Sequence, residues 1–138
     1  MSTYWNSVVP VLNEIHQVKL VEAFVCHQKL HYAGVVDCVA SYQGIPCVCD
    51  WKTADKPKNS ISRLYDAPVQ IAAYLDAVNC FYQDYDLEVN HGLVVVALPE
   101  MPAEVFWFLP EAMQEYTLTW RKRLKLFQQN YEHNLECQ

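Results

Sequence analysis

The amino-acid sequence predicts an α/β protein in which helices flank a mixed β-sheet. Two apolar segments lie on either side of Gln43-Gly44, as expected for antiparallel strands joined by a tight turn. Residues Gly92 to Leu98 form an unbroken apolar run, which is typical of a strand buried on both faces. Asp66 with Pro68, and Pro110 with Glu111, are helix-start signals that precede apolar residues at helical spacing.

The first part of the chain is expected to form one helix and an antiparallel meander of three strands. A helix is predicted from Tyr4 to about Ile15, where apolar residues recur at helical spacing although Pro10 interrupts them. Val18 to Cys26 is rich in β-branched and apolar residues and predicts the first strand. Tyr32 to Ser41 and Ile45 to Lys52 predict the second and third strands.

The second part is expected to alternate between helices and strands. Turn residues at 56–60 predict a loop, and a helix begins near Asp66. Its apolar stripe is Ile71, Leu75, Val78 and Tyr82. After the buried strand from Gly92 to Leu98, Val105 to Leu109 predicts another strand and Pro110 opens the last helix. The stripe of this last helix is Met113, Tyr116, Trp120, Leu124, Phe127 and Tyr131.

Size and composition favour one folded domain that covers residues 1–138. The chain is 52% hydrophobic and 13% aromatic, which is typical of globular rather than disordered proteins. No apolar run reaches the ~20 residues that a membrane helix needs, and the start lacks a secretion signal. We therefore expect a soluble intracellular protein without a membrane partner, cytoplasmic or, in a eukaryote, organellar.

The net charge of -6 disfavours a protein that coats nucleic acid in general. It leaves a nuclease possible, because a bound cation and a few local basic groups can handle phosphate. The six cysteines contain no C-x-x-C pair. We interpret them as small, mostly buried side chains in a reducing compartment.

The turn at Gln43-Gly44 fixes an expected pairing of two acids. If Tyr42 faces Ile45, then Asp37 faces Asp50, with Cβ atoms about 4.5–5.5 Å apart. Two carboxylates this close repel each other unless a proton or cation lies between them. Lys52 shares the sheet face of Asp50, because strand side chains alternate with a period of two.

Such a group of oxygen ligands suits Mg²⁺ or Mn²⁺. The alternative is two solvated acids at a polar hairpin end, with Lys52 as an ordinary counter-charge. A shift of one residue in the register would separate the acids. On the next helix, Gln70 and Tyr74 are four residues apart and share a face that could contact a nucleotide; the alternative is a partly exposed helix flank.

Three segments together resemble a known nuclease family. Gly34-Val35-Val36-Asp37, Asp50-Trp51-Lys52-Thr53 and Gln70-Ile71-Ala72-Ala73-Tyr74 are similar to the motifs of RecB-like nucleases in the PD-(D/E)xK superfamily. Within this group the chain most resembles the mitochondrial genome maintenance exonuclease family, over nearly its whole length. The resemblance implies a restriction-endonuclease-like fold, in which an antiparallel meander and a buried strand form a mixed sheet flanked by helices.

The resemblance also implies metal-dependent hydrolysis of phosphodiester bonds, with Mg²⁺ or Mn²⁺ as the cofactor. Asp37 and Asp50 would hold the metal together with the main-chain carbonyl of Trp51, and Lys52 would be the catalytic lysine. Gln70 and Tyr74 would lie on the substrate side. The related enzymes favour single-stranded DNA and cut it from its ends.

Further substrate contacts are predicted from the residues that follow the lysine. Thr53 could donate a hydrogen bond to phosphate, and Lys56 and Lys58 could attract the DNA backbone. The alternatives are a simple strand end and a solvated loop.

The sequence departs from the family pattern in several places. Asp50 stands where the superfamily often has Glu, and the only candidates for a further upstream ligand are Glu14, His16 and Glu22. The longer N-terminal helical region of the relatives is not evident. Only Cys137 lies near the C-terminus, so we predict no iron–sulfur cluster.

The expected function is that of a metal-dependent DNA exonuclease, acting on single-stranded DNA in replication or repair. One alternative is an endonuclease that cuts flaps or branched DNA. Another is a nuclease-fold module that binds nucleic acid or a protein without cutting it. The sequence does not indicate an oligomeric state.

Overall fold

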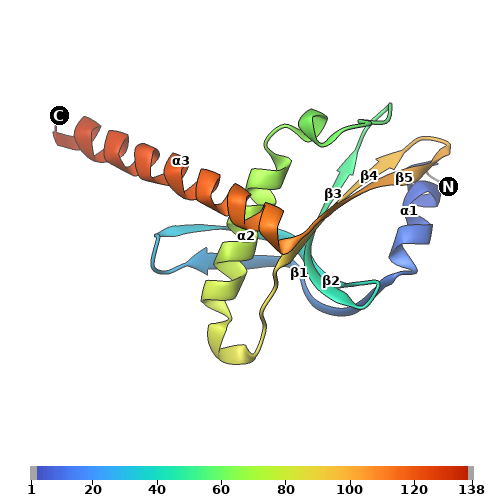
Figure 1. Ribbon diagram of the computed structural model, residues 1–138, viewed down its shortest axis with the longest axis horizontal. Coiled ribbons are helices and arrows are strands. Elements are labelled where there is room, and N and C mark those ends of the chain that lie inside the picture. Colours follow the sequence, from blue (N-terminus) through green and yellow to red (C-terminus); the bar gives the residue numbers. More distant parts are fainter. Residues whose placement is uncertain (1–2, 137–138) are drawn as a thin grey trace.

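A five-stranded mixed β-sheet with helices on both faces forms the body of the molecule (Figure 1). The computed structural model describes residues 3–136. The order of the strands in the sheet is the same as their order in the sequence. They are β1 (Ile15–His27), β2 (Tyr32–Tyr42), β3 (Ile45–Thr53), β4 (His91–Leu98) and β5 (Met101–Phe108). The predicted α/β class and the antiparallel meander of the first three strands are confirmed.

β4 and β5 complete the mixed sheet. β3 and β4 are parallel, whereas β4 and β5 are antiparallel. The crossover from β3 to β4 contains the short helix η1 (Ile61–Leu64), α2 (Ala67–Phe81) and the short helix η2 (Gln83–Tyr85). A parallel pair needs such a long connection, because the chain must return to the same end of the sheet.

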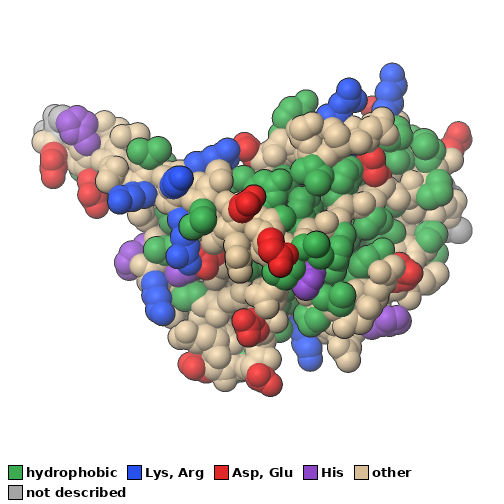
Figure 2. Space-filling view, in the orientation of Figure 1, with side chains coloured by type: hydrophobic (Ala, Val, Ile, Leu, Met, Phe, Trp, Pro, Cys, Tyr) green, Lys and Arg blue, Asp and Glu red, His purple; other side chains and the backbone are tan. Residues whose placement is uncertain are grey.

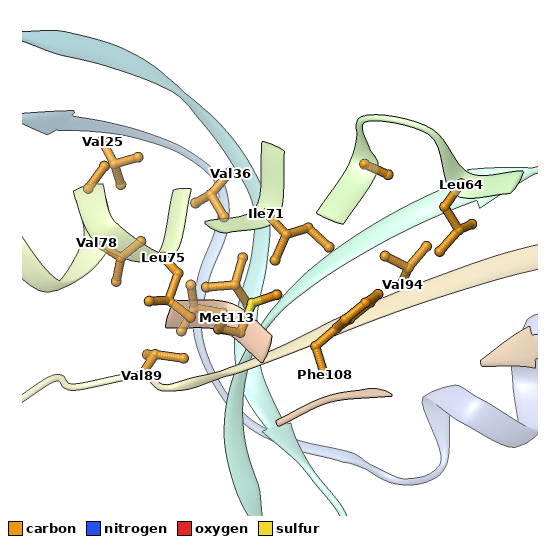
Figure 3. Packing of buried hydrophobic residues seen from close by; sticks show 14 of the residues in the cluster. Val25, Val36, Leu64, Ile71, Leu75, Val78, Val89, Val94, Phe108 and Met113 are labelled. Carbon is orange, nitrogen blue, oxygen red and sulfur yellow. The ribbon is translucent and has the colours of Figure 1, made fainter. Parts of the chain in front are cut away.

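Two separate apolar clusters hold helices against the two sheet faces. On one face α2 and the start of α3 (Pro110–Glu136) pack over β-branched residues of the sheet, as Figure 3 shows for Ile71, Met113 and Val94. On the other face α1 (Thr3–Leu12) packs through Val8 and Val11. The β4 strand is buried from Gly92 to Leu98, as its unbroken apolar sequence predicts.

Several predicted element boundaries are wrong. The first helix ends at Leu12, and Ile15 already belongs to β1, which is longer than the predicted Val18–Cys26. The last strand is Met101–Phe108 and excludes Leu109. Pro10 lies inside the helix, which ends two residues later.

The predicted apolar stripe of the last helix is correct only for its first part. Met113 and Leu124 are buried, but Phe127 and Tyr131 are 67% and 58% exposed. Figure 1 shows why: α3 crosses α2 and then extends away from the sheet. The periodic pattern therefore predicted the helix correctly and its buried length incorrectly.

The predicted burial of the cysteines is confirmed for three residues. Cys38, Cys47 and Cys49 are buried on the α1 face of the sheet, and the sulfur atoms of Cys47 and Cys49 are 3.6 Å apart. Hydrogen bonding to the Cys49 thiol, together with burial, raises the pKa of Cys38. Cys137 lies outside the described residues. Within residues 3–136, no helix is long and apolar enough to cross a membrane.

Candidate active site

The β2–β3 hairpin has the predicted register. Gln43 and Gly44 have φ values of 50° and 84°, and such a pair of positive values is what a tight two-residue hairpin turn requires. Tyr42 pairs with Ile45, and the ladder runs without a shift as far as Cys38 and Cys49. Asp37 and Asp50 occupy the next position, just beyond the last regular pair.

The three predicted catalytic side chains come together at this end of the hairpin. The ammonium Nζ of Lys52 lies 3.0 Å from Oδ2 of Asp50, and the backbone N–H of Trp51 donates a hydrogen bond of 3.1 Å to Oδ2 of Asp37. The carboxylates of Asp37 and Asp50 are close enough to interact directly. The alternative of two solvated acids at a polar hairpin end does not hold, because Asp50 is buried.

A break in the strand alternation lies next to Asp37. Val36 and Val39 both face the α2 side of the sheet, although they are an odd number of residues apart. Cys38, between them, faces the α1 side. The alternation therefore shifts between Val36 and Cys38, while Asp37 stays on the face opposite Cys38 that the hairpin register gives it.

The electrostatics of Asp50 are unfavourable without a cation. Burial raises the pKa of its carboxyl group, and the neighbouring Asp37 raises it further, while the Lys52 ammonium opposes the rise. Apart from its 3.0 Å ion pair with Lys52, Oδ2 of Asp50 is a buried oxygen without a hydrogen-bond partner among the described residues. A buried oxygen in this state beside a second carboxylate fits a divalent cation, which would satisfy its free lone pair and offset the repulsion.

A cation at this site would need further ligands. Within residues 3–136, no group of three or more His, Cys, Asp or Glu side chains is arranged to hold a metal ion. Asp37 and Asp50 would therefore be joined by main-chain oxygen, water and substrate, which is common for Mg²⁺. The Trp51 carbonyl is the predicted main-chain ligand, and the Trp51 ring packs on the opposite face with the α1 cluster.

None of the three candidates for a further upstream metal ligand completes the site. Glu14 lies at the turn end of the hairpin, where its backbone and side chain contact Gln43. His16 pairs with Ser41 in the same region. Glu22 is opposite Asp37 by the register of its neighbours, but it is exposed and has a φ of 45°.

Gln70 and Tyr74 lie on α2, which packs on the sheet face to which Asp50 and Lys52 point. The Gln70 side-chain amide donates a hydrogen bond of 3.2 Å to the Tyr74 hydroxyl, so the predicted shared face exists. The Tyr74 ring lies on Gly34, where an added Cβ would be only 2.8 Å from Cε1 of the ring. The glycine of the Gly-Val-Val-Asp segment therefore makes room for the tyrosine of the third motif, a contact that the sequence pattern alone does not indicate.

Replacing Gly34 by Ala should test this contact. The new methyl group displaces the Tyr74 ring, and we expect an overpacking cost of about 1–3 kcal/mol in the free energy of unfolding. In a Tyr74→Ala background the same change should cost much less, because the clashing ring is gone. Urea unfolding of the four proteins measures this coupling, and equal costs in both backgrounds would refute the contact.

The loop that follows the lysine carries the other predicted substrate residues. A hollow of about 650 Å³ lies at the end of β3. Its lining includes Thr53, Lys56, Lys58, Arg63 and Tyr65. Figure 2 shows Lys and Arg side chains gathered at this edge of the molecule. Glu104 of β5 holds the loop in place by accepting backbone N–H bonds from Lys58 at 2.7 Å and Asn59 at 2.8 Å.

Removing the Glu104 carboxylate should free this loop. We expect Glu104→Ala to lower the free energy of unfolding by about 1.5–3 kcal/mol, since both hydrogen bonds are charge-assisted. Amide hydrogen exchange of residues 56–60 should accelerate at the same time. The exposed Glu88→Ala, which changes the net charge equally, serves as the control, and unchanged exchange in Glu104→Ala would contradict this role.

The sheet order and the flanking helices define an α/β protein of a class consistent with the restriction-endonuclease-like fold. No family model matches the chain. Three curated proteins named mitochondrial genome maintenance exonuclease 1 are similar to it. The human protein is 40% identical over 90% of this chain, the Mus musculus protein 42% over 88%, and the Xenopus tropicalis protein 41% over 94%. The matched regions cover 36%, 36% and 37% of these relatives, so the chain spans little more than a third of their length.

Proposed function

We propose that this chain is the nuclease centre of a divalent-metal-dependent DNA exonuclease of the PD-(D/E)xK type, acting on single-stranded DNA. The observation that carries the proposal is the convergence of Asp37, Asp50 and Lys52 at one end of the β2–β3 hairpin. The similarity to proteins named as exonucleases supports the same activity class. The metal, the strand preference and the direction of cutting go beyond these relatives' names.

The arrangement of the side chains supports the following roles. Asp37 and Asp50 would hold Mg²⁺ or Mn²⁺ with the Trp51 carbonyl, and this ion would supply Lewis-acid polarisation of the scissile phosphate. Lys52 can donate to a phosphate oxygen or orient the attacking water, because its ammonium is fixed beside Asp50 and is still one-third exposed. Gln70 and Tyr74 would position the DNA strand from α2, and Thr53, Lys56 and Lys58 would contact its phosphates.

The assay for this function uses linear single-stranded DNA labelled at either end, with Mg²⁺ or Mn²⁺. An exonuclease releases mononucleotides or short products from one labelled end first, and leaves circular single-stranded DNA intact. Cleavage of the circle would indicate the endonuclease alternative. Binding of both DNAs without any cleavage would indicate a non-catalytic module.

A further inference from the structure

A second hollow lies beside the Gln70–Tyr74 pair, where α3 crosses α2. Its volume is about 340 Å³, within the range of small-ligand pockets. Residues of β2, α2 and α3 line it, including Tyr32, Gln70, Tyr74, Trp120 and Arg123. Three rings, one amide and one guanidinium therefore surround a space large enough for a planar group.

The wall contributed by α3 is fixed in position. Arg121 makes two hydrogen bonds of 2.9 Å to the Asp76 carboxylate on α2, and Arg123 pairs with Asp66 at 3.0 Å. Gln128 adds a 3.0 Å hydrogen bond to the Leu30 carbonyl in the β1–β2 turn. The middle of α3 is thus held against α2 and β2, although its end extends into solvent.

Trp120 brings a large aromatic ring to this hollow. Its indole ring lies edge-on to Tyr32, with ring centroids 5.1 Å apart. The Tyr32 hydroxyl donates its hydrogen to the Ala73 carbonyl at 2.8 Å, and it also interacts with the Trp120 side chain. The indole nitrogen is buried, so the part of Trp120 that can serve a ligand in the hollow is its ring.

The hollow lies close to the candidate active site. Tyr74 is one of its walls and also lies on Gly34, three residues before Asp37 on the same strand. Three residues of β-strand span about 10 Å. One strand of DNA can therefore occupy the carboxylate site and this hollow together.

We propose that this hollow is a nucleobase subsite, in which a base of the single-stranded substrate stacks on Tyr74 and Trp120. The proposal rests on the function proposed above, since it assigns a contact to the same substrate. Stacking on aromatic rings tolerates any base sequence, which suits an enzyme that moves along a strand. Arg123 at the rim, with its side chain half exposed, can pair with the adjoining phosphate.

The test measures DNA binding separately from cleavage. All proteins carry Lys52→Ala and are kept in EDTA, and the probes are a labelled oligothymidylate and an abasic oligonucleotide of equal length. Trp120→Phe keeps a smaller ring and should weaken oligothymidylate binding about 3- to 10-fold. Trp120→Leu loses the ring and should weaken it about 10- to 100-fold. Neither change should affect binding of the abasic probe.

Trp107 provides the matched controls. It lies on β5, where it packs with the α1 face cluster and stacks on His91 at 4.9 Å, so Trp107→Phe and Trp107→Leu should bind oligothymidylate normally. The subsite is overturned if folded Trp120 variants bind oligothymidylate like the parent, or if their loss persists with the abasic probe. It is also overturned if the parent does not prefer oligothymidylate to the abasic probe. Cleavage by the protein with Lys52 intact decides the proposed function independently of these outcomes.

Discussion

Lys52→Ala should lower the rate constant for cleavage of single-stranded DNA about 10²- to 10³-fold at saturating Mn²⁺. The side chain is the only cation within 4 Å of the buried Asp50 in the described part of the chain, and under the proposed function its ammonium would donate to the scissile phosphate. Loss of one such preorganised donor typically costs this factor in the chemical step. Single-turnover cleavage of end-labelled DNA measures the effect without interference from product release.

Two controls accompany this measurement. Lys19→Ala removes an equal charge from an exposed position on β1 and should cleave at the parent rate. Because Lys52→Ala also leaves the Asp50 carboxylate buried without its ion pair, rates are normalised to the folded fraction found by circular dichroism. Equal cleavage rate constants for Lys52→Ala and Lys19→Ala would show that Lys52 takes no part in catalysis.

Asp50→Asn should abolish cleavage and, in the absence of metal, raise the melting temperature. The environment of Asp50 raises the pKa of its carboxyl group, so the folded protein favours a neutral side chain at this position. The amide removes the repulsion with Asp37 and the cost of burying the charge, at the expense of the ion pair with Lys52. Functional residues that destabilise the protein in this way are common at active sites.

The same variant should lose its response to metal. For the parent protein, Mn²⁺ at a hundred times its Kd should add about 2.7 kcal/mol to the free energy of unfolding, because the ion binds only the folded state. Asp50→Asn should show little of this gain, whereas the exposed Asp84→Asn should keep all of it. Thermal melts with EDTA and with Mn²⁺ give the stability without and with metal. A parent protein whose melting temperature does not change with Mn²⁺ would contradict the metal site.

The sequence was sufficient to predict those parts of the site that depend on local rules. Gln43-Gly44 determined the turn, the turn determined the register, and the register brought Asp37 and Asp50 together. The apolar run of β4 likewise predicted burial on both faces. These inferences succeeded because short-range backbone geometry decides them.

Other features depend on contacts between distant parts of the chain and could not be predicted. Gly34 and Tyr74 are forty residues apart in sequence, and only the packing of α2 on β2 explains the glycine. Glu104 looks like an ordinary strand acid, yet it holds the loop that carries Lys58. The exposure of Phe127 follows from the course of α3, which crosses α2 and then extends away from the sheet, and periodicity alone does not indicate this.

The position of a bound Mn²⁺ ion tests the central claim most directly. Crystals grown with MnCl₂ and measured at the manganese absorption edge should show one anomalous peak in contact with carboxylate oxygens of both Asp37 and Asp50, at roughly 2.0–2.2 Å. The Lys52 ammonium should remain on the same side of the sheet as this peak. Manganese bound elsewhere, or density between the two carboxylates that stays empty in crystals of an active protein, would contradict the proposed centre.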